Sequence, residues 1–139
     1  MRFHLGDNEF KGLIKLSDLP DASLLPEKQR LRLRVYQASS EIRAARDCEG
    51  FAAYIYSGGD FIDRATRASM KQCAPPFSSG DLLAFSRPEL RDSLVMTHWG
   101  ISLGEDLVLS KYGQGDLRID TVNDLVFNYG SDLVLSIKI

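Results

Sequence analysis

Cys48 and His98 are the two residues of this sequence whose types and surroundings could support nucleophilic chemistry. Cys48 follows Asp47 at the point where a helical pattern starts, so its sulfur is expected at a helix N-terminus. Backbone N–H groups and the helix dipole stabilise a thiolate there and lower the pKa of the thiol. We therefore predict that Cys48 is a nucleophile, and a buried structural cysteine is the alternative.

His98 is the candidate base, because it lies within a segment, residues 95–103, that alternates as a strand does. The predicted strand places His98 on one face with Met96, Gly100 and Ser102, where the small residues leave room for the N-terminus of a helix. An imidazole there could accept the thiol proton and later protonate a leaving amine. The alternative is a histidine on a solvated sheet face.

The elements that must position these two residues fall into two groups along the chain. Pro26 suits the first turn of a helix, whose buried face would carry Leu31, Val35, Ala38 and Ile42. The alternation in the letters RLRLRVY leaves a strand there as an alternative.

Further helices are predicted over residues 48–56, ended by Gly58 and Gly59, and over residues 61–72. In the second half, strands are predicted over 82–85, 95–103, 107–110, 117–119 and 133–139. A helix over 121–129 is predicted between the last two, with Thr121 and Gly130 as its caps. Helices followed by an antiparallel sheet predict an α+β fold with segregated layers.

The composition indicates one ordinary globular domain of 139 residues, with a net charge of −2. The chain has no surplus of lysine and arginine over acidic residues that would favour nucleic acid as a partner. We expect no membrane span and no signal peptide, hence a cytoplasmic protein or one exported without a leader. Two cysteines, far in sequence from either histidine, predict neither a zinc site nor a disulfide.

Three short motifs of the sequence resemble motifs of one protein family. Residues 47–51 (DCEGF) resemble the nucleophile helix of the NlpC-type cell-wall peptidases, which opens D-C-S-G-[FL]. Residues 80–85 (GDLLAF) resemble the G-D-L-x-x-F strand that follows it. Residues 98–104 (HWGISLG) resemble the strand that begins with the catalytic histidine. The motifs occur in family order, and the resemblance implies that residues 46–120 form an NlpC-like catalytic core and residues 1–45 an N-terminal helical extension.

The resemblance implies a papain-like domain in which the nucleophile helix packs on a C-terminal antiparallel sheet. It implies amide hydrolysis through an acyl-enzyme, with Cys48 as nucleophile, His98 as base and no cofactor or metal. The family's third polar residue, which orients the base, falls on Ser110, and Asp120 is a second candidate. The implied substrate is the peptide stem of bacterial peptidoglycan.

Four residues beside the expected cleft are candidate substrate contacts: Asp47, Glu49, Lys111 and Tyr112. The chain departs from the family at two positions, because Glu49 replaces the serine after the nucleophile and Ser110 replaces a longer polar residue. Two other functions therefore stay open: a different thiol acyl transfer or deamidation, and a non-catalytic interaction module on the same fold. An exported bacterial effector of this kind would also have an inhibitory or immunity protein as a partner.

Overall fold

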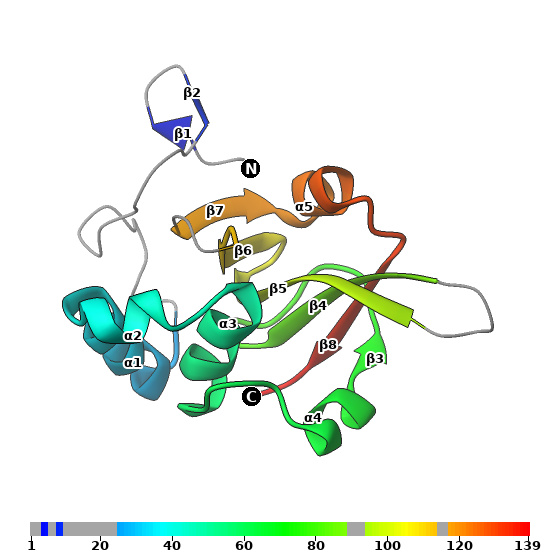
Figure 1. The fold of residues 1–139 in the computed structure, drawn as a ribbon. Coiled ribbons are helices and arrows are strands. Elements are labelled where there is room, and N and C mark those ends of the chain that lie inside the picture. Colours follow the sequence, from blue (N-terminus) through cyan, green and yellow to red (C-terminus); the bar gives the residue numbers. More distant parts are fainter. Residues whose placement is uncertain (1–3, 6–7, 10–24, 89–93, 114–116) are drawn as a thin grey trace.

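The computed structural model describes residues 4–5, 8–9, 25–88, 94–113 and 117–139 (Figure 1). The helices are α1 (Glu27–Ala38), α2 (Ser40–Ala44), α3 (Cys48–Ser57), α4 (Arg64–Ser69) and α5 (Val122–Tyr129). The strands are β1 (His4–Leu5), β2 (Asn8–Glu9), β3 (Lys71–Gln72), β4 (Leu82–Pro88), β5 (Leu94–Gly104), β6 (Leu107–Lys111), β7 (Leu117–Thr121) and β8 (Leu133–Ile137).

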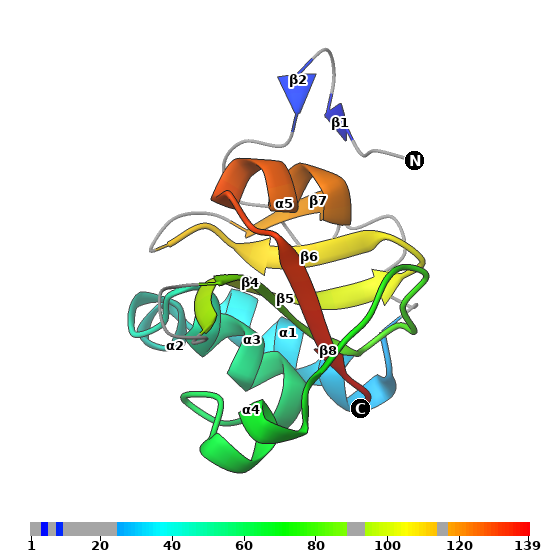
Figure 2. The ribbon, with the colours of Figure 1, turned by 90° about the vertical axis from the view of Figure 1, so that its right-hand side faces the viewer.

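A six-stranded sheet in the order β3-β8-β4-β5-β6-β7 forms the centre of the fold. Every pairing in it is antiparallel. Helices α1, α3 and α4 lie on one side of the sheet and α5 lies on the other (Figure 2). The structure thus confirms the α+β class that the order of elements predicts.

Two hydrophobic clusters occupy the two faces of the sheet. The larger joins α1 and α3 to one face of β5, through Leu33, Phe51, Trp99 and Ile101. The smaller cluster packs α5 against the opposite face, through buried residues that include Phe85 and Leu125. Because β4 and β5 are covered on both sides, polar residues at their centres, such as His98, become fully buried.

The predicted N-terminal helical extension, residues 1–45, is helical in its second half. Residues 27–44 form α1 and α2, which are separated at Ser39, and the Ser39 hydroxyl caps α2 by accepting from the Ile42 N–H. Residues 4–5 and 8–9 pair as two short antiparallel strands. The other residues before Leu25 lie outside the described part of the chain.

The predicted buried face of α1 is wrong. Leu31 and Val35 are 51% and 48% exposed, whereas Gln29, Leu33 and Tyr36 are buried. The reason is that polar residues face inward to supply hydrogen bonds, so that hydrophobicity alone does not mark the inner face. Arg32 donates to the carbonyls of Ile55 and Tyr56 at the end of α3, and Gln29 donates to the carbonyl of Gly80.

Two further boundaries differ from the prediction. The helix expected over residues 61–72 is limited to α4, and Lys71 and Gln72 form β3 instead. Strand β5 contains a register shift, since His98 pairs with Phe85 while Met96 pairs with Ser86. The extra residue reverses the alternation before it, so Met96 packs against the larger cluster rather than sharing the face of His98.

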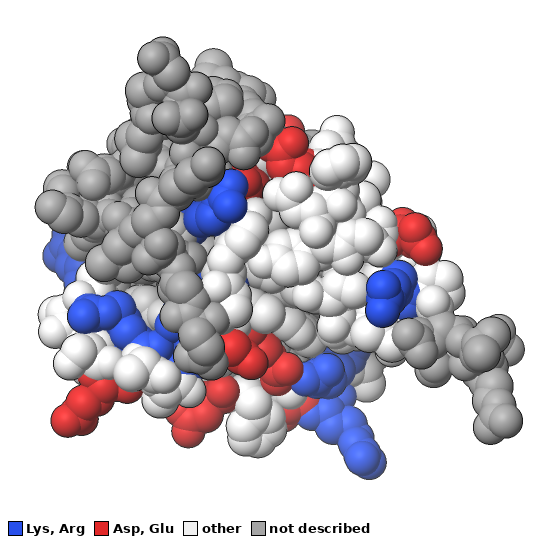
Figure 3. Space-filling model, turned by 45° about the horizontal axis from the view of Figure 1, so that its top comes forward, with Lys and Arg blue, Asp and Glu red and all other residues white. Residues whose placement is uncertain are grey.

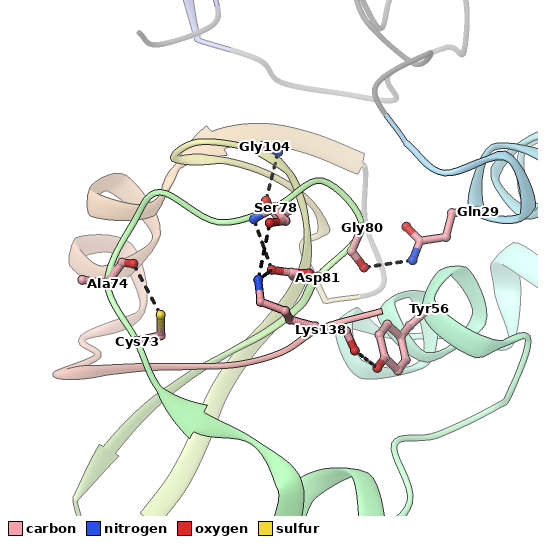
Figure 4. Close-up of polar contacts among 10 residues, drawn as sticks. Gln29, Tyr56, Cys73, Ala74, Ser78, Gly80, Asp81, Gly104 and Lys138 are labelled. Atoms are coloured by element: carbon pink, nitrogen blue, oxygen red, sulfur yellow. Dashed lines mark hydrogen bonds and ion pairs between the residues drawn. The ribbon is translucent and has the colours of Figure 1, made fainter.

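At the G-D-L motif of residues 80–82 the chain turns and enters β4 (Figure 4). Gly80 has a φ of 95°, which glycine adopts without strain. The carboxylate of Asp81 accepts from the Ser78 N–H at 3.1 Å and lies 3.6 Å from the Lys138 ammonium near the C-terminus. This turn fixes the start of the strand that pairs with the histidine strand.

A pair of leucine substitutions tests which face of α1 is buried. We expect Leu33→Ala to lower the free energy of unfolding by about 2–5 kcal/mol, because it leaves a cavity in the larger cluster. Leu31→Ala should change it by less than about 0.5 kcal/mol, since that side chain is half exposed. Urea denaturation followed by circular dichroism measures both. Equal losses for the two variants would contradict the observed packing.

Candidate active site

Cys48 is the first residue of α3, as the sequence predicts. The Asp47 side chain caps the helix by accepting from the Gly50 N–H at 3.0 Å, and Gly58 ends it with a φ of 82°. Gly50 is needed for the docking of this turn, because a Cβ there would lie 2.9 Å from Cβ and Cγ of Arg46. The local sequence therefore places the cysteine sulfur at a capped helix N-terminus.

The thiol of Cys48 is half-buried and packs at the edge of the larger cluster. Burial raises the pKa of Cys48, a backbone hydrogen bond from Trp99 acts against this rise, and the Asp47 carboxylate adds to it. Burial therefore outweighs the lowering of the pKa that the helix N-terminus predicts. Cys48 is a neutral thiol in this structure near neutral pH.

Glu49, the first departure from the family pattern, is bound by neighbours on the side of α4. Its carboxylate accepts from the Ile62 N–H at 3.1 Å and forms an ion pair with Arg67 at 2.8 Å. The Arg67 guanidinium also lies over the Trp99 ring, 5.0 Å from its centroid. Arg67 thus pairs with the charge beside the nucleophile, which still adds a little to the raised pKa of Cys48. Glu49 connects α3 to α4 and, through Arg67, to β5.

His98 is fully buried among aromatic rings. Tyr129 of α5 stacks on the imidazole with a centroid distance of 4.0 Å and an angle of 12°. Tyr112 approaches edge-on at 5.4 Å, and Phe85 lies at 6.1 Å. Neither nitrogen of the His98 ring has a hydrogen-bond partner among the residues that the structure describes. Burial lowers the pKa of His98 to about 3, so the imidazole is neutral.

The predicted docking of the Cys48 helix on the sheet face of His98 is wrong, because α3 packs on the face of Trp99 and α5 covers the face of His98. Cys48 meets the strand that carries His98 without a hydrogen bond between thiol and imidazole. The hydrogen bond from Trp99 places the sulfur against the residue that follows His98. Cys48 also adds to the raised pKa of Tyr129, about 12, which is caused chiefly by burial of that phenol. Cys48 therefore lies near the backbone of Trp99 in β5 and near Tyr129, the ring that stacks on His98.

Neither candidate for the third catalytic residue bonds to the histidine ring. Ser110 is buried on β6, on the same sheet face as Gly100 and His98, and its hydroxyl has no hydrogen-bond partner within the described residues. Asp120 accepts from the Tyr112 hydroxyl at 3.0 Å and pairs with Arg118 at 3.5 Å. Rings rather than a carboxylate or amide orient the imidazole in this structure.

The other candidate contacts differ in accessibility. Asp47 is exposed, Glu49 and Tyr112 are half-buried, and Lys111 is 3% exposed. The Lys111 ammonium donates to two backbone carbonyls, and the Tyr112 hydroxyl is bound to Asp120, so both side chains are engaged within the protein. The substrate-binding role predicted for these four residues stays a prediction.

Sequence reasoning did not single out Tyr129 and Phe85, which pack on His98. One signal was available for Tyr129, because it follows Leu125 by four residues and therefore lies on the buried face of α5. Phe85 was assigned to a strand, but its pairing with His98 depends on the register of β4 and β5.

Charged side chains of both signs lie on one face of the described structure. Lysine and arginine alternate with aspartate and glutamate on the face drawn in Figure 3, beside a wide uncharged area. In the described part of the chain, histidine, cysteine and carboxylate side chains form no group of three that could hold a metal ion. No helix in that part has both the length and the hydropathy of a membrane span.

Comparison of the chain with protein-family models, curated proteins and solved structures gives no match.

The burial of His98 predicts a specific dependence of stability on pH. The folded-state pKa of about 3 lies below the ordinary value of 6.5, so between these values the unfolded chain binds a proton that the folded chain does not. The stability contributed by neutral His98 is complete above pH 6.5 and is lost as the pH falls toward 3. The slope is about 1.4 kcal/mol per pH unit.

His98→Phe is the matched variant for this measurement, because it keeps an aromatic ring but removes the titrating group. We expect the unfolding free energy of the wild type to fall more steeply between pH 6 and pH 4 than that of His98→Phe (roughly by the slope of one such group). Urea denaturation at several pH values measures the unfolding free energy of both proteins. The carboxylates that the two proteins share contribute equally to each curve, so their effect cancels in the difference between the curves. Parallel curves for the two proteins would contradict a buried neutral imidazole.

Proposed function

We propose that this chain is a cysteine hydrolase that cleaves amide bonds through an acyl-enzyme, with Cys48 as nucleophile and His98 as base. The observation that carries the proposal is the docking of a capped helix N-terminus, bearing Cys48, against the strand residue that follows His98. The imidazole of His98 is neutral, so one of its nitrogens can accept a proton, and neither nitrogen is hydrogen-bonded within the described residues. The resemblance to the NlpC-type peptidases supports the same two roles.

The two neutral groups favour proton transfer during the attack rather than a preformed ion pair. His98 accepts the thiol proton while the Cys48 sulfur bonds to the carbonyl carbon. The carbonyl oxygen then becomes an oxyanion, which the first backbone N–H groups of α3 stabilise. His98 returns the proton to the nitrogen as the C–N bond breaks, and a thioester remains. Water, deprotonated by His98, hydrolyses the thioester and restores the thiol.

The substrate class that the resemblance supports is the peptide stem of bacterial peptidoglycan. The pairing of Glu49 with Arg67 supports a working nucleophile, because it holds the extra carboxylate of this chain, whose charge is the smallest of the causes that act on the pKa of Cys48. In this proposal the chain acts on a peptide amide and needs no further group for the chemistry. An inhibitory or immunity protein is the proposed partner of an exported form.

The ring packing on His98 favours a second candidate, a non-catalytic interaction module. Tyr129 and Tyr112 cover the imidazole, and burial shifts both pKa values away from those of an ion pair. In that case Cys48 and His98 are packing residues and the fold serves to bind another protein. Other thiol acyl transfers or deamidation would need the same dyad as the hydrolase and differ from it in the acceptor.

Incubation with a panel of synthetic stem peptides, followed by mass spectrometry, tests the hydrolase directly. We expect cleavage by the wild type and by Cys73→Ser, which removes the exposed second cysteine. Cys48→Ala should abolish cleavage, and His98→Phe should reduce the rate by about 100-fold or more, as expected for loss of a general base.

The same samples separate the two candidates. A covalent acyl adduct on Cys48 in the intact mass, at low pH where hydrolysis of the thioester slows, would support the acyl-enzyme. Absence of cleavage, together with a Cys48 that no acylating peptide ester modifies, would contradict the hydrolase and favour the interaction module. Amide transfer to an added amine without net hydrolysis would identify an acyl transferase.

A further inference from the structure

A buried lysine connects β6 to the segment that leads into α3. The Lys111 ammonium donates to the carbonyl of Arg43 at 2.7 Å and to the carbonyl of Arg46 at 2.7 Å. Arg43 lies in the last turn of α2, and Arg46 comes directly before Asp47, the N-cap of α3. One side chain therefore holds both ends of the short connection between the two helices.

The surroundings of this ammonium make the contact specific. Lys111 is 3% exposed, and its Nζ lies 5.5 Å from the centroid of the buried Tyr36 ring. A buried charge is costly unless hydrogen bonds satisfy it, and the two carbonyls do so here. The Arg43 carbonyl also lies in the last turn of α2, where a cation interacts favourably with the helix dipole.

Lys111 is the last residue of β6 and lies beyond the end of the β5–β6 pairing. The β5–β6 pairing runs from Gly104 and Leu107 to Ile101 and Leu109, two residues before Lys111. Helix α3 contacts both of these strands. On the β5 side the backbone of Trp99 holds the Cys48 sulfur, and on the β6 side Lys111 holds the residues just before it. The N-terminus of α3 is thus attached to both strands.

We propose that Lys111 is a positioning residue that fixes Cys48 against the Trp99 backbone of the histidine strand by attaching residues 43–47 to β6. It acts through the helix N-terminus and not through contact with the substrate. The catalytic part of this inference rests on the proposed function, whereas the structural part does not.

Hydrogen exchange of the backbone amides tests the structural part without any substrate. Lys111→Met keeps the aliphatic stem and removes the ammonium. We expect exchange of amides 43–50 to rise by about tenfold or more, as loss of hydrogen bonds to a charged donor predicts, with β4 and β8 unchanged. Lys111→Arg, which retains donors, should restore part of the protection. Lys71→Met, at an exposed lysine of β3, is the control and should change nothing in residues 43–50.

Cleavage of a stem peptide tests the catalytic part. Lys111→Met should lower kcat by about tenfold or more while KM changes by less than about twofold, because the variant displaces the nucleophile without removing a substrate contact. A rise in KM with unchanged kcat would overturn the inference and assign Lys111 to substrate binding. An inactive wild type would contradict the proposed function alone, since the exchange result still decides whether Lys111 holds the helix.

The wild type provides the test if Lys111→Met does not fold. Reductive methylation of the folded chain should modify Lys71 readily, while Lys111 should react only as fast as amides 43–50 exchange. Fast modification of Lys111, with those amides still protected, would overturn the inference because the contact would then be dispensable.

Discussion

The burial of His98 without a hydrogen-bond partner is the constraint on which the arrangement of this fold depends. A buried polar group left unpaired costs about 1–3 kcal/mol, and both nitrogens of this ring are unpaired in the described structure. Stacking and edge contacts with Tyr129 and Tyr112 hold the ring instead. A fold that keeps such a group at the centre of its sheet sacrifices stability there, which is typical of functional sites.

The elements around His98 follow from this constraint. Helix α5 brings Tyr129 onto one side of the ring, and β4 brings Phe85 beside it. Helix α3 approaches from the other face of the sheet and meets the strand at Trp99. The candidate site therefore draws on both helical layers of the fold. The nucleophile comes from the layer on one face of the sheet, and the aromatic ring that covers His98 comes from the layer on the other face.

Local signals in the sequence predicted the elements that carry the site. Asp47 and Gly58 define α3, and Thr121 and Gly130 cap α5, because capping depends on residues within a few positions of the helix end. These predictions are confirmed, as is the α+β class. The strand that contains His98 was likewise visible in its alternating pattern.

Long-range contacts could not be predicted in the same way. The inward face of α1 was missed because Arg32 and Gln29 turn inward to bind carbonyls of α3 and of the turn before β4. The one-residue shift in β5 has no clear mark in the sequence, yet it decides which face Met96 occupies. Lys111 reads as a cleft residue by its position, and only the tertiary structure shows its bonds to the segment before α3.

The titration of His98 is the most direct test of whether aromatic rings enclose a neutral imidazole. A chain with His4→Gln and ¹⁵N-labelled histidine leaves one imidazole to follow by NMR. We expect the ring nitrogens to keep the chemical shifts of neutral imidazole from pH 7 down to at least about pH 4, while the protein stays folded. A titration midpoint near the ordinary value of 6.5 would contradict this expectation, because the ring would then be hydrated or paired with a charge rather than enclosed by Tyr129 and Tyr112.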